Sequence, residues 1–381
     1  MALDALVELG QYRITASAFA GMAMLEVARR NRIISLLLLL ITSYVLISTL
    51  TTVPVPSPRS LWTTSDTCAT ANHRWRGAND RIFPKSGASV SITHKDYSDG
   101  LVNHDVSVLL AHSNSEEYSI TVEVFTSHPI EQGDFQINYS HDELILSTLV
   151  AKGSSLLNDK KSRGSGHCFV IKVTVLIPTS KPLSGLKVNL PSANFYIHES
   201  AAGAMPYLDV SIGRGSIIMA PHHRVHVESL RFEVLKGAIS GSVLLTNSLL
   251  VFLQHGSVDL DIDFSPYLVG AEVQVTQESG SQQVLLNDLF YRPVTGTYSL
   301  ARGTIDIHYP KSYSGRLLVD LDQGRGQVSG NGLQIIDQTE NPYALEARQG
   351  VGMTTTKVHV GSGRVVMRVD DPGTFVPELI E

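Results

Sequence analysis

Four short stretches decide the fold of this chain: GRGSIIM at 213–219, LKGAISGSV at 235–243, QHGSVDLDIDF at 254–264 and ARGTIDIHY at 301–309. Each contains a glycine, then a small residue, then a β-branched residue. Gly215, Gly237 and Gly256 are 22 and 19 residues apart, close to the length of one coil of a β-solenoid. A coil needs sharp corners, which favour glycine, and it buries its inner face only against neighbouring coils. The motif therefore predicts stacked coils, although Gly303 follows Gly256 only after 47 residues.

The surrounding sequence supports an all-β architecture. From residue 89 onward, apolar and polar residues alternate in short runs rich in β-branched and aromatic side chains, with the period of two that is typical of strands. No amphipathic helix of normal length interrupts the chain after Leu186, which excludes βαβ folds. We expect a β-solenoid-like stack of strands, and a β-sandwich stays open as the alternative. A short helix could lie within 141–158, and the glycine pairs at 324–326 and 330–332 indicate turns.

A second pattern, near the N-terminus, predicts a membrane anchor. Residues 33–53 are uncharged and mostly apolar, and at ~1.5 Å per residue a helix of this length crosses the ~30 Å hydrocarbon layer. Arg29, Arg30 and Arg32 precede it, which places the N-terminus in the cytosol. We favour an uncleaved signal anchor over a cleaved signal peptide because the preceding region is long. The rest of the chain would then be extracellular or luminal.

These patterns define the expected domain organisation. It comprises a cytosolic tail (1–32), a transmembrane helix (33–53), a stalk (54–85), a β-rich first part of the ectodomain (86–180), a β-solenoid-like domain (181–370) and a C-terminal tail (371–381). The formal net charge is −6, which argues against a nucleic-acid partner because such a partner would need a strongly basic surface.

The two cysteines and one sequon fit an exported domain. Cys68 and Cys168 are candidates for a disulfide, which export would permit, and two unrelated thiols are the alternative. Asn138 begins the sequence Asn-Tyr-Ser, an acceptor for N-glycosylation in an exported protein.

One cluster carries residue types that bind metals. His222, His223, His226 and Glu228 occur in PHHRVHVE, and imidazole and carboxylate groups are the ligands that zinc prefers. The alternative is an exposed loop that enters a strand. We therefore keep these four residues as candidates and predict no metal and no cofactor.

A second cluster carries carboxylates. Asp259, Asp261 and Asp263 alternate in SVDLDIDF and would share one face of a strand, and Asp306 could join them if strands stack in register. Rows of carboxylates can bind calcium or act in pairs on sugars. The alternative is a solvated strand face. No nucleophile elbow, Walker loop or dinucleotide fingerprint occurs in the chain.

The stretch CFVIKVTVLIPTSKPLSGLKVNLPSANFYIHE at 168–199, followed by the four glycine-containing stretches, resembles the adhesin-head-like β-solenoid family of uncharacterised bacterial surface proteins and its fungal relatives. Some of those fungal relatives carry a single N-terminal membrane anchor. The resemblance covers roughly residues 168–369 and implies a stacked β architecture at the cell surface. It implies no reaction and no catalytic residues.

Together these features predict a single-pass membrane glycoprotein that displays a non-enzymatic β-rich ectodomain for adhesion, surface display or scaffolding. Its partners would be the membrane and cell-surface glycans or proteins. One alternative is a polysaccharide-active β-helix lyase or hydrolase that uses the carboxylate cluster. A second alternative is an endomembrane component without a surface role.

Overall fold

The computed structural model describes most of the chain from Cys68 to Asp370. The described residues are 68, 71–75, 81–82, 84, 89–98, 102–113, 117–130, 133–140, 142–149, 167–178, 183–198, 205–220, 225–265, 269–287, 289, 292–340 and 343–370. They belong to one compact unit that begins at Thr64. No helix among them is long and apolar enough to cross a membrane. The expected span at 33–53 and the expected tails at 1–32 and 371–381 lie outside the described residues.

All regular structure in the described part of the chain is β-strand, so the predictions of an all-β fold and of stacked strands are confirmed. The strands are β1 (His73–Arg74), β2 (Arg81–Ile82), β3 (Ser89–Asp96), β4 (Val102–Ser113), β5 (Ser119–Thr126), β6 (Phe135–Ser140), β7 (Glu143–Thr148), β8 (His167–Pro178), β9 (Gly185–Ile197), β10 (Met205–Met219), β11 (Val225–Phe264), β12 (Ala271–Asn287), β13 (Val294–Tyr309), β14 (Gly315–Gly330), β15 (Gln334–Glu340), β16 (Tyr343–Gln349) and β17 (Thr354–Val369).

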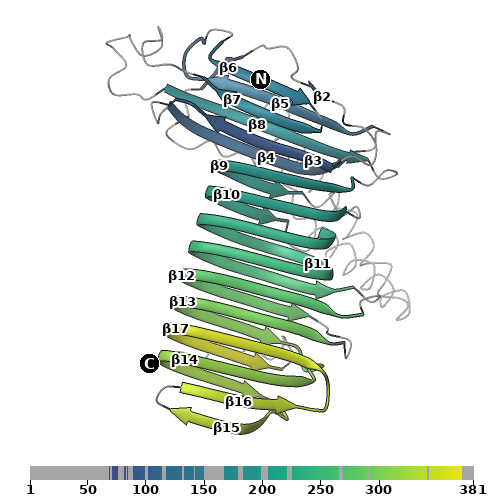
Figure 1. Ribbon diagram of the computed structural model, residues 1–381, viewed down its shortest axis with the longest axis vertical. Helices are drawn as coiled ribbons and strands as arrows, with labels where there is room; N and C mark the ends of the chain where they lie inside the picture. Colours follow the sequence, from purple (N-terminus) through teal and green to yellow (C-terminus); the bar gives the residue numbers. More distant parts are fainter. Residues whose placement is uncertain are drawn as a thin grey trace, which may run out of the picture. The chain divides into compact units, whose positions relative to one another are not determined.

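A parallel, in-register stack runs from β9 to β14 (Figure 1). From β10 onward each strand bends at a glycine, with two such glycines in the long strand β11, and these glycines lie one above another. We call them the glycine column: Gly215, Gly237, Gly256, Gly280, Gly303, Gly363 and Gly324, in spatial order. All have φ between 131° and 151°. A Cβ atom on any of them would lie 1.6–1.8 Å from the carbonyl oxygen of the residue below, so no other amino acid fits.

The bend lets one strand supply both sides of a coil. Inward side chains of both strand halves alternate with outward ones and join one continuous apolar core. In β11 the strand continues unbroken through nearly two coils. Gly241, with φ of 120°, makes a second close approach there, to the carbonyl of Met219. This corner replaces a loop, which explains why Gly237 and Gly256 are only 19 residues apart.

The last coils do not stack in chain order. β17 lies between β13 and β14 and pairs in parallel with both. β16 then pairs antiparallel with β14, and β15 pairs antiparallel with β16 (Figure 1). All seven residues of β15 are exposed, and the pairing of β15 with β16 is irregular between Ile335 and Asp337. This antiparallel pair ends the parallel stack.

Before β9 the two sides of the coil separate into two sheets. The first half of β9 pairs with β3, which continues to β7 and β6. The second half pairs with β4, which continues to β8 and β5. We call these sheets the two arms. The solenoid-like interpretation therefore describes β9 to β14, whereas the alternative of two facing sheets describes the residues before β9.

A buried polar chain joins the arms. The hydroxyl of Thr148 lies 3.1 Å from Nε2 of His94 and 3.1 Å from Nε2 of His104. Asp96 lies 3.5 Å from Nδ1 of His104, which favours a proton there. Thr148 then donates to His104 and accepts from His94, whose Nδ1 is left buried without a partner in the described structure. Burial lowers the pKa of His94 to about 4, and burial also lowers the pKa of His104.

Three expectations about local structure need correction. Glu143–Thr148 is strand β7 and not part of a helix, because its alternating Leu144 and Leu146 are buried between the arms. The expected stalk at 54–85 contributes β1 and β2, which pair with β5, so folded structure begins earlier than residue 86. Gly324 belongs to the glycine column inside β14 and not to a turn, whereas 331–332 form a turn as expected.

Candidate interaction surface

The aspartates of SVDLDIDF lie on β11 but do not gather into a group of free carboxylates. Asp259 is exposed, and its neighbour in register is Gln283, which in turn neighbours Asp306. Asp259 and Asp306 are thus two strands apart, at roughly 10 Å. Arg368 lies 3.8 Å from Asp306. Asp263 is buried.

Asp261 has a structural role in the stack. It accepts hydrogen bonds from the side-chain amide of Asn287 on β12 and from the hydroxyl of Ser242, 3.5 Å away. Both partners lie on neighbouring coils, so this carboxylate links three coils. Of the residues that the structure describes, no group of three or more His, Cys, Asp or Glu side chains is placed to hold a metal ion.

The other candidate residues are placed as follows. His222 and His223 lie outside the described residues, as does the side chain of His226, and Glu228 is exposed on β11. Cys68 and Cys168 form a disulfide with a Cα–Cα distance of 5.5 Å, and both residues are buried. Asn138 is exposed on β6, which pairs only with β7 among the described strands.

A broad surface not foreseen from the sequence lies on the strand halves that precede the glycine column. Seven strands contribute to it in the spatial order β11, β12, β13, β17, β14, β16 and β15. Their outward side chains align in two adjacent rows, which we call the ladder face. The first row is Leu250, Gln274, Thr297, Lys357, Leu318, Glu346 and Asp337. The second row is Phe252, Thr276, Ser299, His359, Asp320, Ala344 and Thr339.

The ladder face holds two shallow hollows. One, of about 650 Å³, is lined by residues of β13, β17, β14, β16 and β15, among them Thr297, Leu318 and Ala344. The other, of about 320 Å³, lies over β11 and β12 beside Leu250 and Phe252. Six strand spacings of ~4.8 Å give the two rows a length of roughly 29 Å. The hollows therefore lie along one continuous track.

The charges of the ladder face concentrate near the end of the stack. Arg316 donates to Glu346 at 2.7 Å, and this hydrogen bond raises the pKa of Arg316. Nδ1 of His359 lies 3.5 Å from Asp320. Elsewhere the face carries hydroxyl and amide groups beside the apolar side chains of Leu250 and Phe252. Such a surface can hydrogen-bond and pack against an extended partner, and its chemistry is that of binding.

A specific signal in the sequence could have revealed this face. Hydroxyl and amide residues recur at the same distance before successive column glycines, as in Thr276 before Gly280 and Ser299 before Gly303. The glycine motif does not reveal this alignment because Gly280 is followed by Ser-Gln and lacks the β-branched residue. Without Gly280, the coil register between Gly256 and Gly303 could not be set.

No protein-family model matches the chain, and no curated protein matches it in sequence. Among solved structures, a proposed adhesin from Bacteroides fragilis is 12% identical, with 75% of this chain and 95% of that chain covered and a TM-score of 0.34. A proposed cell adhesion protein from Clostridium sporogenes is 10% identical, with 76% and 97% covered and a TM-score of 0.19. Scores this low carry no argument about function, and both proteins are bacterial, so the expected fungal relationship gains no support.

Proposed function

We propose that the β-rich part of this chain is a non-enzymatic binding module that a single N-terminal membrane span displays for adhesion or scaffolding. The observation that carries the proposal is the ladder face. Its two registered rows extend over seven strands and combine hydroxyl, amide and apolar side chains with open hollows. A rigid stack presents these groups at a fixed ~4.8 Å repeat. Because folding has already ordered this surface, little conformational entropy is lost when a partner binds.

The placement of the acidic residues supports binding over catalysis. Glycoside cleavage needs two carboxyl groups about 5–10 Å apart on either side of one bond. Asp259 and Asp306 approach that separation, but Gln283 lies between them and Arg368 lies beside Asp306. We therefore assign the contact role to the ladder face, and we expect its partners to be cell-surface glycans or proteins.

The first test concerns topology. The full-length chain with a C-terminal tag is expressed in intact cells, which are treated with a protease, and the tag is expected to be digested. Deglycosylation is expected to shift the migration of the protein, and the Asn138→Gln variant is expected not to shift. A tag protected until the plasma membrane is opened would favour an endomembrane component. A cytosolic tag would contradict the proposal.

The second test concerns the surface itself. In the variant Thr297→Arg with Ser299→Arg, two long side chains fill the larger hollow, and we expect binding of cells to fall about tenfold or more. The matched control is Gln283→Arg with Gln327→Arg, which adds the same charge to exposed positions beyond the glycine column. Equal binding by both variants would remove the ladder face from the proposal.

A further inference from the structure

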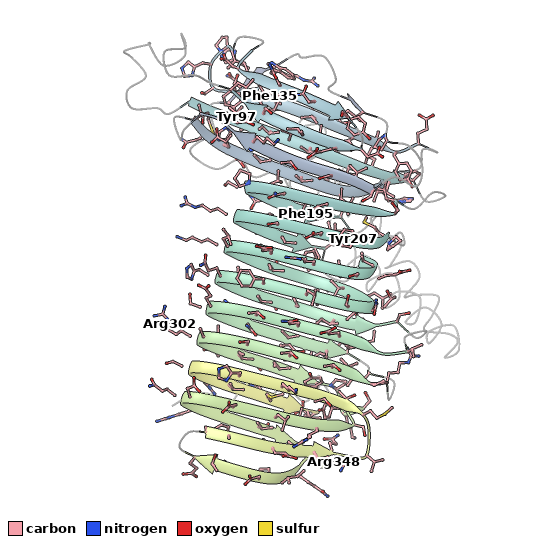
Figure 2. All side chains as sticks on the ribbon, in the orientation of Figure 1. Tyr97, Phe135, Phe195, Tyr207, Arg302 and Arg348 are labelled. Carbon is pink, nitrogen blue, oxygen red and sulfur yellow. A yellow bond between two sulfur atoms is a disulfide. The ribbon has the colours of Figure 1, made fainter. Side chains whose placement is uncertain are left out.

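A line of cationic side chains follows the corner at which the strands bend. Arg214, Lys236 and Arg302 directly precede their column glycines, and Arg364 and Arg325 directly follow theirs. Arg214 pairs in register with Lys236, and Arg364 pairs in register with Arg325. Figure 2 shows Arg302 extending away from the edge of the strands. We call these five residues the basic ridge.

The charges of the basic ridge are not neutralised within the described part of the chain. All five side chains belong to exposed residues, and none forms an ion pair with another described residue. Other arginines of the same strands do form ion pairs, for example Arg316 with Glu346 and Arg368 with Asp306. The chain as a whole has a net charge of −6, so this concentration of unpaired positive charge is a local feature.

The corner between these cations carries mostly small hydroxyl side chains, together with His255 before Gly256 and Gln323 before Gly324. The hydroxyl residues beside the glycine column are Ser216, Ser257, Ser279, Ser281, Thr304 and Ser362. Ser279 pairs in register with Arg302, which pairs in turn with Ser362. The column glycines themselves have no side chain, so a partner can approach the backbone. Hydroxyl groups both donate and accept hydrogen bonds, as the hydroxyls of a sugar also do.

The basic ridge extends along the stack and not across it. From β10 to β14 the column passes through seven levels, whose six spacings of ~4.8 Å give roughly 29 Å. A cation stands at five of these levels. A ligand that satisfies all of them must be an extended polymer with repeated negative charges.

We propose that the basic ridge binds an acidic polysaccharide, with the carboxylate or sulfate groups of the polymer against the cations and its hydroxyls against the serine and threonine side chains. This inference deepens the adhesive role proposed above and rests on it. A nucleic acid fits the ridge less well. Proteins that bind single strands use grooves with several aromatic side chains on which bases stack, whereas the residues directly beside the column glycines include one aromatic ring, the imidazole of His255.

The test uses the purified full-length protein in detergent, with polygalacturonate as the probe and neutral dextran as the uncharged polymer. We expect polygalacturonate to bind and its affinity to fall as salt is raised, because exposed charges are screened. The triple variant Arg302→Gln, Arg325→Gln, Arg364→Gln is expected to weaken binding about tenfold or more. The matched control changes the same net charge at Lys95→Gln, Lys187→Gln and Arg348→Gln, and it is expected to change affinity less than about twofold.

Each of the following three outcomes would overturn the inference. Equal loss in both triple variants would show that net charge and not the basic ridge decides binding. Binding of duplex DNA as tight as that of polygalacturonate would show a general polyanion surface. Absence of polygalacturonate binding by the wild-type protein would also refute the ridge as its site. None of these results would alter the cell-surface and ladder-face tests, so failure of this inference stays separate from failure of the adhesive role.

Discussion

The stack and the two arms cover both sides of the apolar core in different ways. In the stack, a single strand bends at a glycine and supplies both sides of a coil, so each coil needs one strand. In the arms, two separate strands such as β3 and β4 supply the two sides. The change occurs at β9, whose residue in the column position is Ala193. A Cβ is allowed there because the pairing of β9 with β3 ends at Asn189 and its pairing with β4 begins at Asn194, so neither strand pairs with Ala193.

This difference teaches where the stability of each region comes from. The stack depends on backbone contacts that no side chain can replace, since each column glycine lies against the carbonyl below. The arms depend on side chains: the Phe135–Phe169 ring contact at 6.1 Å and the buried histidine pair lie between the two sheets, and the disulfide lies in a separate buried cluster with Val170. Substitutions should therefore affect the two regions through different mechanisms.

The largest effect is expected in the glycine column. In Gly256→Ala the new Cβ would lie 1.7 Å from the carbonyl oxygen of Gly237, at a φ of 143°. The coils must separate, and we expect a loss of about 4 kcal/mol or more of stability, seen as failed expression or a large fall in Tm. The control is Gly133→Ala in the arms, where a Cβ would meet nothing within 4 Å. An unchanged Tm for Gly256→Ala would refute close stacking.

The next effect separates the arms from the stack. Replacing both cysteines, Cys68→Ser with Cys168→Ser, opens a link between residues 100 apart in sequence. We expect a loss of about 2–5 kcal/mol in denaturant unfolding. In limited proteolysis, cleavage should begin in the arms while fragments that contain β10 to β13 persist. Simultaneous loss of both regions would show that they unfold as one cooperative unit.

A fall in pH should destabilise the arms before it destabilises the stack. The pKa of His94 is about 4 in the folded protein and 6.5 in its ordinary state, so the unfolded chain takes up the proton first as pH falls. The free energy of unfolding is therefore unaffected by His94 above pH 6.5. It falls by about 3 kcal/mol as the pH drops from 6.5 to about 4. Hydrogen exchange of β3, β4 and β7, corrected for intrinsic rates, should rise over this range. Exchange of β12 and β13 is the internal control, and an equal rise there would contradict the prediction.

The smallest effect tests the boundary between the regions. Ala193→Gly introduces the residue of the column at a position where no strand lies below. Added backbone freedom in the unfolded chain should cost about 0.5–1 kcal/mol, measured by denaturant unfolding. A gain in stability would contradict this and would mean that the Cβ of Ala193 is in a strained contact, as a Cβ would be at a column glycine.

The sequence foretold the stack better than the arms. Gly215, Gly237, Gly256 and Gly303 were recognised because a corner leaves a local trace, a glycine before a β-branched residue. Gly363 and Gly324 do not match this motif because arginine follows each of them. The insertion of β17 between β13 and β14 has no local trace at all, since both candidate neighbours present similar edges.

The candidate sites show the same division. The alternation of Asp259, Asp261 and Asp263 predicted a shared orientation, but whether they stay free depends on neighbouring coils, such as the one that brings Asn287 to Asp261. The ladder face and the basic ridge depend on register between coils 19 to 24 residues apart, with β17 out of order. Residues that only the tertiary register brings together could not be grouped from one sequence.

The position of β17 also sets the order in which the molecule can assemble. β13 and β14 each pair with β17, so the edge of β13 stays open until the chain has been made as far as residue 369. A chain that emerges N-terminus first can complete its earlier coils as they appear, but its final coils must wait. During that interval β13 is an exposed sheet edge, open to pairing with another chain. Of the strands that the structure describes, β17 is thus made last and closes the parallel stack, and a nascent chain that stops short of it exposes the edge of β13.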